Sequence, residues 1–118
     1  MEPFEIKPEE VSGIPVIRVS GFFNDRAGDQ LNAIAQEILR KGKNKIVLDF
    51  SATKVINSPG TSLLTELVWV VNDDFKGKIL LSGLDKLKLN VFKTVGIIPP
   101  AEGVTDIETG VKNLLGAP

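Results

Sequence analysis

The chain has 118 residues, of which 42% are hydrophobic and 25% are charged, so one globular domain spanning residues 1–118 is predicted. Fourteen basic against fifteen acidic residues give a net charge of −1, which argues against nucleic acid or an anionic membrane as partner. Cysteine and histidine are absent, which excludes a disulfide framework, the usual kind of zinc site and the commonest general base.

The first predicted elements are two strands followed by a helix. Phe4 and Ile6 alternate with charged residues, and "GIPVIRVSG" follows after the turn-like "EEVSG", a pattern typical of an antiparallel hairpin. From Arg26 onward apolar residues recur at helical spacing, with Asn24 or Asp25 as N-cap and Gly42 as the stop. The predicted buried face of this helix consists of Ala27, Leu31, Ile34, Ala35 and Ile38.

The middle of the chain alternates strand, helix and strand. "KIVLDF", residues 45–50, is a nearly continuous apolar run typical of a central strand covered on both faces. "KILLSG", residues 78–83, is a second such strand, and the helix between them predicts a right-handed parallel crossover. The apolar face of that helix is formed by Leu63, Leu64, Leu67, Val68 and Val71.

The last third of the chain is predicted to add two helices and a short strand. Asp85 is placed to cap a helix that Gly96 ends, and a short strand is expected near Val104. Thr105 and Glu108 have the spacing of a capping box before the final helix. The sequence therefore predicts an α/β domain with a mixed central sheet of four to five strands and about four helices. The helix capped by Asp85 carries Leu87, Val91, Phe92 and Val95.

The junction "VINSPGTSLL", residues 55–64, is the predicted site, because ligands and partners of α/β sheets gather at the carboxyl ends of strands. Ser58 is expected as the N-cap, with Pro59 at the first helical position. A glycine in a helix is less stable than alanine by about 1 kcal/mol. We therefore expect another backbone or a partner to approach closely at Gly60.

One side of this helix is polar and faces away from its apolar residues. At 100° per residue, Ser58, Ser62, Thr65 and Trp69 follow one line along that side. Two interpretations of Trp69 remain open: it packs under a neighbouring helix, or it anchors a protein interface, where tryptophan is enriched.

The chain resembles the STAS domain, the fold of bacterial anti-sigma-factor antagonists, over essentially its whole length. The resemblance is carried by "VIRVSGFFN", "NKIVLDFSATKVINSPGTSLL" and "KILLSGLDKLKLNVFKTVGI". It implies a cytoplasmic module in transcription signalling that binds an anti-sigma factor which is also a serine kinase. In that family the kinase phosphorylates a serine at the start of the second helix, and the added charge of about −2 ends the binding.

Compared with the family's Asp-Ser-Ser-Gly motif, this chain has Asn57, Ser58, Pro59 and Gly60, so proline occupies the place of the phosphorylated serine. The resemblance thus implies partner binding without the usual phosphoswitch. The alternative is a displaced phosphorylation site at Ser58, Thr61 or Ser62. A family aspartate after the second strand is replaced by Asn24. Together with the polar side of the second helix, these positions give the predicted partner-binding residues: Asn24, Asn57, Ser58, Pro59, Gly60, Thr61, Ser62, Thr65 and Trp69.

Other functions stay open beside this interpretation. The domain could be a STAS scaffold or regulatory subunit of a transport or stress-signalling assembly. It could also sense a small neutral ligand through Asn24, Asn57 and Ser58, with Arg26 nearby. An enzyme is not expected, since no catalytic residue, metal pattern or cofactor motif is found. The acidic N-terminus and the short apolar runs predict neither a signal peptide nor membrane insertion.

Overall fold

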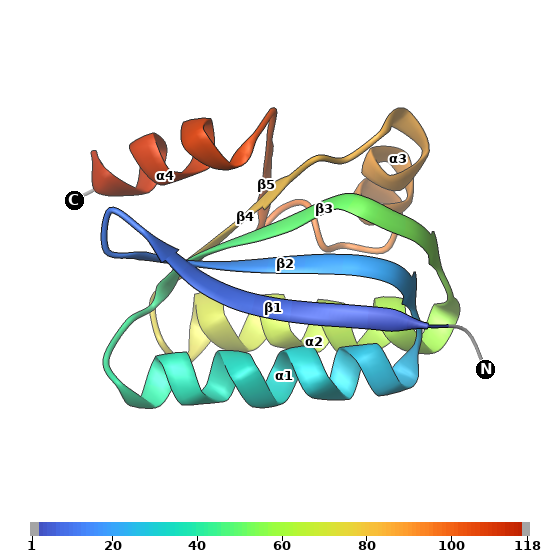
Figure 1. The fold of residues 1–118 in the computed structure, drawn as a ribbon, viewed down its shortest axis with the longest axis horizontal. Coiled ribbons are helices and arrows are strands. Elements are labelled where there is room, and N and C mark those ends of the chain that lie inside the picture. Colours follow the sequence, from blue (N-terminus) through green and yellow to red (C-terminus); the bar gives the residue numbers. More distant parts are fainter. Residues whose placement is uncertain (1–2, 117–118) are drawn as a thin grey trace.

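The computed structural model describes residues 3–116, which form one mixed sheet and four helices (Figure 1). The predicted fold class is confirmed, and the sheet has five strands. The strands are β1 (Phe4–Val11), β2 (Ile14–Phe23), β3 (Lys45–Ile56), β4 (Lys78–Ser82) and β5 (Glu102–Val104). The helices are α1 (Asp25–Arg40), α2 (Ser58–Asp73), α3 (Lys86–Thr94) and α4 (Ile107–Leu115).

The strands lie in the sheet in the same order as in the sequence, from β1 to β5. The predicted hairpin is present: β1 pairs antiparallel with β2, and Ser12 and Gly13 form its turn with φ of 52° and 82°. From β2 onward all pairs are parallel, so α1, α2 and α3 are crossover helices. The short strand expected near Val104 is β5.

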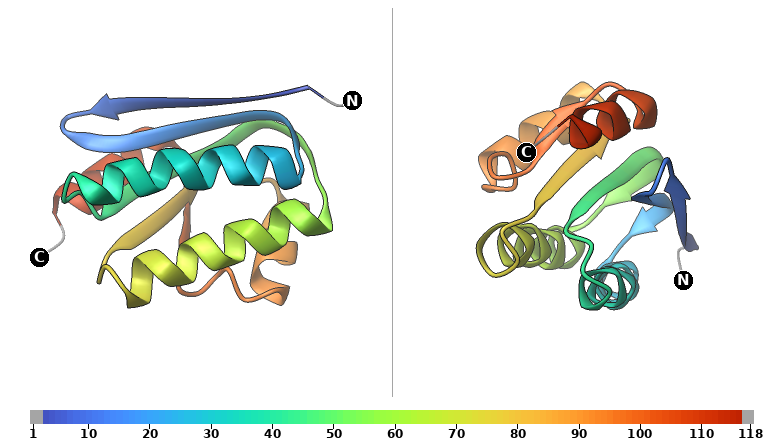
Figure 2. Two further views of the ribbon diagram at one scale, coloured as in Figure 1. Left: turned by 90° about the horizontal axis from the view of Figure 1, so that it is seen from below. Right: turned by 90° about the vertical axis from the view of Figure 1, so that its left-hand side faces the viewer.

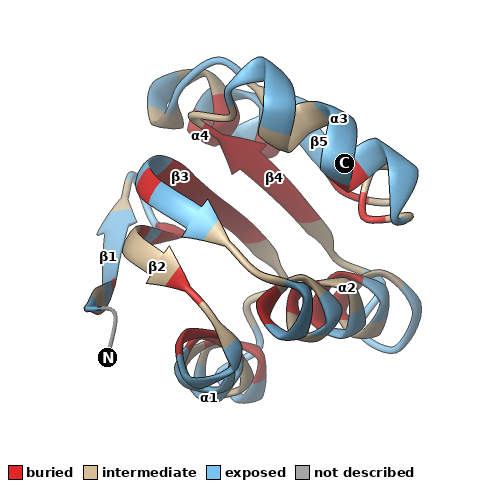
Figure 3. Cartoon of the chain, turned by 90° about the vertical axis from the view of Figure 1, so that its right-hand side faces the viewer, coloured by how far each residue is buried: buried red, intermediate tan, exposed pale blue. Residues whose placement is uncertain are grey.

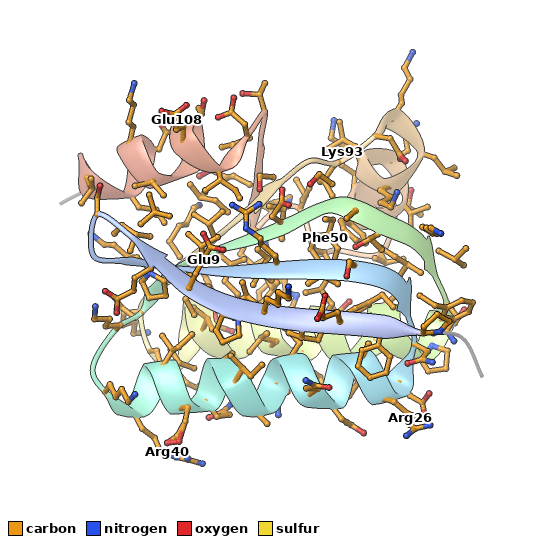
Figure 4. The ribbon with its side chains drawn as sticks, in the orientation of Figure 1. Glu9, Arg26, Arg40, Phe50, Lys93 and Glu108 are labelled. Atoms are coloured by element: carbon orange, nitrogen blue, oxygen red, sulfur yellow. The ribbon has the colours of Figure 1, made fainter. Side chains whose placement is uncertain are left out.

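Helices cover both faces of the sheet. α1 and α2 lie side by side on one face, while α4 lies on the other (Figures 1 and 2). The larger core lies under α1 and α2 and contains Phe50 of β3, which is labelled in Figure 4. The Phe50 ring makes edge-to-face contacts with Phe23 and with Phe92 of α3. Both ring pairs have centroids 5.8 Å apart, so α3 is joined to the same core as the two long helices.

Short polar side chains cap all four helices of residues 3–116, and the sequence predicted two of these four caps correctly. Asn24 caps α1 and Asp85 caps α3, each accepting a hydrogen bond from a backbone N–H three residues later. The predicted capping box of α4 is wrong, because Asp106 accepts from the N–H of Thr109 and leaves Thr105 outside the helix. Aspartate is at least as good an N-cap as threonine, which explains the shift by one residue.

None of the helices in residues 3–116 has both the length and the apolar content that crossing a bilayer needs.

Candidate functional site at the N-terminus of the second helix

The junction between β3 and α2 begins with an asparagine cap. β3 continues to Ile56, and the Oδ1 atom of Asn57 accepts a hydrogen bond of 2.9 Å from the backbone N–H of Gly60. Ser58 is therefore the first helical residue and Pro59 the second, and the predicted Ser58 cap is wrong by one residue. Proline is tolerated at either position because the first four N–H groups of a helix have no partner within it. The shift leaves the Ser58 side chain exposed instead of using it for the cap.

Gly60 allows the start of α2 to approach the end of β2. A Cβ atom at Gly60 would collide with the backbone carbonyl of Phe23, and the N–H of Asn57 donates to that same carbonyl at 3.2 Å. The close approach predicted for Gly60 is thus made by the protein's own backbone. Because Asn24 follows Phe23 directly, the starts of α1 and α2 lie next to each other at the carboxyl ends of β2 and β3. Figure 3 views the molecule from this side.

A shallow groove of about 460 Å³ runs between α2 and α3. The hydroxyl of Thr61 donates to the carbonyl of Asn57 at 2.9 Å and that of Thr65 donates to Thr61 at 2.8 Å, so both are engaged within the helix. Ser58 and Ser62 are exposed. No charged side chain lines this groove within the described part of the chain, so it suits an uncharged or apolar surface. Its lining consists of Ile56, Asn57, Ser58, Thr61, Ser62, Thr65, Val91 and Val95.

Trp69 is partly exposed and also contacts the segment that follows α3. Its side chain is 45% exposed, and its indole N–H donates a 3.1 Å hydrogen bond to the carbonyl of Gly96, just after α3. The indole therefore ties α2 to the end of α3 while leaving much of its surface open to solvent.

The structure adds residues of α3 and β3 to the candidate site. Leu87 and Val91 of α3 and Val95, its C-cap residue, are exposed, although Phe92 of the same helix is fully buried. Val55, near the end of β3, is also exposed. The sequence shows the spacing of four between Leu87, Val91 and Val95, but spacing alone does not tell a buried face from an open one.

A polar cluster lies where the middle of β3 pairs with the end of β4. Asp49 is only 5% exposed, and its two carboxylate oxygens accept hydrogen bonds from Ser51 at 2.6 Å and Ser82 at 2.8 Å. These bonds compensate the burial of the carboxylate, which marks the cluster as structural. Within residues 3–116 no group of three or more acidic side chains is arranged to hold a metal ion.

No protein-family model and no curated protein sequence matches this chain. Solved structures do match. The anti-sigma factor antagonist SpoIIAA in its unphosphorylated form is 20% identical, with a TM-score of 0.76 over 96% of this chain and 100% of that chain. The phosphorylated form from Bacillus is 20% identical, with a TM-score of 0.73 over 93% and 99% of the two chains.

Two further similar structures differ in the size of the protein that contains the fold. An anti-sigma factor antagonist from Mycobacterium paratuberculosis is 14% identical, with a TM-score of 0.78 over 94% of this chain and 93% of that chain. The murine anion transporter Slc26a9 is 13% identical, with a TM-score of 0.71 over 92% of this chain and 19% of that chain. The chain therefore has the STAS fold of the anti-sigma-factor antagonists, as the resemblance in its sequence predicted.

Proposed function

We propose that this protein is an anti-sigma-factor antagonist-like binding module, which docks a kinase-type anti-sigma factor or a related partner through the start of α2. The observation that carries the proposal is the uncharged groove between α2 and α3, with the exposed Ser58 and Ser62 on its α2 side. The groove begins at the carboxyl edge of the sheet, where α/β folds bind their ligands. The docking surface includes Asn24, Asn57, Ser58, Pro59, Gly60, Thr61, Ser62, Thr65 and Trp69.

The proposed module lacks the usual serine switch. Pro59 has no hydroxyl to accept a phosphate, and the side chain of Asn57 is an uncharged amide engaged in the helix cap. Of the three displaced candidates, Thr61 already donates its hydroxyl to a backbone carbonyl, whereas Ser58 and Ser62 are exposed. A displaced switch would therefore use Ser58 or Ser62, and binding without phosphorylation control is the simpler proposal.

A charge placed inside the groove tests the proposal. The kinase-type anti-sigma factors encoded in the source genome are purified and titrated against the protein by isothermal calorimetry. Ser62→Glu should weaken the complex at least about tenfold, since it puts a carboxylate into a groove whose lining has no cation to pair with it. Ala33→Glu on the outer side of α1, also exposed, is the matched control and should leave affinity unchanged. The proposal fails if none of these proteins binds the wild type, or if both variants bind equally well.

A second candidate function is a regulatory part of a transport assembly. It is favoured by the occurrence of the same fold within the anion transporter Slc26a9. In that case the protein would copurify with a membrane transporter and show no affinity for a kinase-type anti-sigma factor.

The small-ligand interpretation has less support. The side-chain oxygens of Asn24 and Asn57, which would bind such a ligand, already accept hydrogen bonds from the helix starts.

A further inference from the structure

Exposed large apolar side chains are concentrated on one side of the molecule. Seven such side chains occur among the described residues, and five of them belong to α3, the end of β3 or the outer side of α2. Soluble proteins rarely leave contiguous apolar surface open unless it binds something. These five residues, here called the α3 patch, are Val55, Trp69, Leu87, Val91 and Val95.

Two depressions meet at the centre of the α3 patch. The uncharged groove between α2 and α3 lies on one side of Val91. A second depression of about 260 Å³ lies on its other side, between α3 and the end of β3. Because Val91 lines both, a partner segment crossing α3 could place apolar side chains into the two depressions at once. The second depression is lined by Lys54, Val55, Ile56, Asp85, Leu87, Lys88, Val91 and Phe92.

The second depression carries an unbalanced positive charge. Lys88 forms an ion pair of 2.8 Å with Asp85, whose carboxylate also accepts the backbone N–H of Lys88. Lys54 is exposed, and no carboxylate of the described residues lies within ion-pair distance of its ammonium group. A complementary surface would therefore be apolar opposite Val91 and would bring a carboxylate to Lys54.

We propose that the α3 patch is the second half of the docking surface and receives an amphipathic helix of the partner protein. Apolar residues one turn apart on that helix occupy the two depressions, and an acidic residue at one end faces Lys54. This inference rests on the proposed function, because it extends the docking surface from the start of α2 onto α3.

Leu87→Glu tests the apolar part of the patch. Leu87 is 73% exposed, so the variant should fold like the wild type. Leu115→Glu is the matched control, since Leu115 is 56% exposed on another nine-residue helix outside the patch. With the anti-sigma factor that binds the wild type, Leu87→Glu should weaken binding at least about tenfold and Leu115→Glu less than about twofold.

Lys54→Glu tests the charged part, with Lys41→Glu at the C-terminal end of α1 as its control. Lys54→Glu should slow association and reduce the dependence of the association rate on salt, as expected when an attractive charge pair is lost. Lys41→Glu should change neither the association rate nor its dependence on salt.

The outcomes separate this inference from the function on which it rests. If the wild type binds and Ser62→Glu weakens binding, but Leu87→Glu and Lys54→Glu bind like the wild type, the inference is wrong and the proposed function stands. If no kinase-type anti-sigma factor binds the wild type, both fall. The inference is also overturned if Leu87→Glu abolishes binding to vesicles with anionic headgroups but leaves partner affinity unchanged, since the patch would then bind a lipid surface.

Discussion

At the scale of single residues, the start of α2 shows what a sequence reveals about a helix cap and what it does not. "NSPG" indicates a helix start, but Asn57 and Ser58 are both good caps, and proline is tolerated at either of the first two helical positions. Which of the two residues caps the helix depends on the Phe23 carbonyl, to which the N–H of Asn57 donates a hydrogen bond. That contact joins residues far apart in the sequence, so local pattern could not predict it.

The cap formed by Asn57 can be tested by two substitutions. Asn57→Ala removes the oxygen that accepts the Gly60 N–H and should lower the free energy of unfolding by about 1 kcal/mol. Asn57→Asp keeps an acceptor and adds a negative charge at the helix start, so it should be neutral or slightly stabilising. Urea denaturation followed by circular dichroism measures both. Equal losses in the two variants would show that the cap is not what stabilises the junction.

Gly60 is predicted to be required for folding stability. Gly60→Ala would press a methyl group against the Phe23 carbonyl and should cost about 1–3 kcal/mol, the usual range for overpacking. Gly103→Ala is the control, because its nearest contact would be Leu89 at an ordinary 3.5 Å. Thermal unfolding should show a clear decrease for Gly60→Ala and little change for Gly103→Ala. A Gly60→Ala variant as stable as the wild type would remove the structural explanation for this glycine.

At the scale of elements, α3 differs most from what its sequence suggests. Leu87, Val91, Phe92 and Val95 all belong to a predicted helix, yet only Phe92 enters the core. α3 has nine residues and lies where the parallel strands end (Figure 3). Phe92 is therefore its one buried residue. The periodicity of a helix is readable from sequence, but its position relative to the sheet is not.

The start of α3 should depend on pH. Hydrogen bonds from the Lys88 side chain and from its backbone N–H hold the pKa of Asp85 below its ordinary value of 3.8. A lowered pKa in the folded state means that the carboxylate stabilises the helix above pH of about 4, and that this contribution is lost as the pH falls further. The amide resonance of Lys88, followed by NMR between pH 6 and about 2, should titrate within this range.

Asp85→Asn provides the control for that titration, because the amide keeps a cap acceptor but does not ionise. The Lys88 amide of this variant should no longer shift with pH. If the Lys88 amide resonance of Asp85→Asn still shifts with pH, the shift is caused by another carboxylate.

The contact between α2 and α3 gives a further test. Trp69→Ala removes one hydrogen bond to Gly96 and a half-exposed ring, so the stability loss should stay near 1 kcal/mol. Partner binding should weaken by at least about tenfold, because exposed tryptophans are frequent interface anchors. Thermal unfolding and calorimetric titration on the same samples separate the two effects. A large loss of stability with unchanged affinity would make Trp69 a structural residue only.

At the scale of the whole molecule, the order of elements was the most predictable feature. The hairpin, the buried strands and the helices between them followed from periodicity, and right-handed crossovers then place α1 and α2 on one face of the sheet. The resemblance to the STAS fold was carried by the same stretches. The α3 patch, in contrast, forms only when α3, the end of β3 and the outer side of α2 come together in space. Of its five residues, the sequence predicts only Trp69 as part of an interface.

We propose that this protein binds a kinase-type anti-sigma factor and is not released from it by phosphorylation. The most direct test incubates the complex with ATP and magnesium and follows the intact mass and the bound fraction. The wild type should keep its unmodified mass and stay bound, whereas Pro59→Ser, which restores a hydroxyl at the switch position, should gain one phosphate and dissociate. Stoichiometric phosphate on Ser58, Thr61 or Ser62 of the wild type, followed by release of the partner, would contradict the claim.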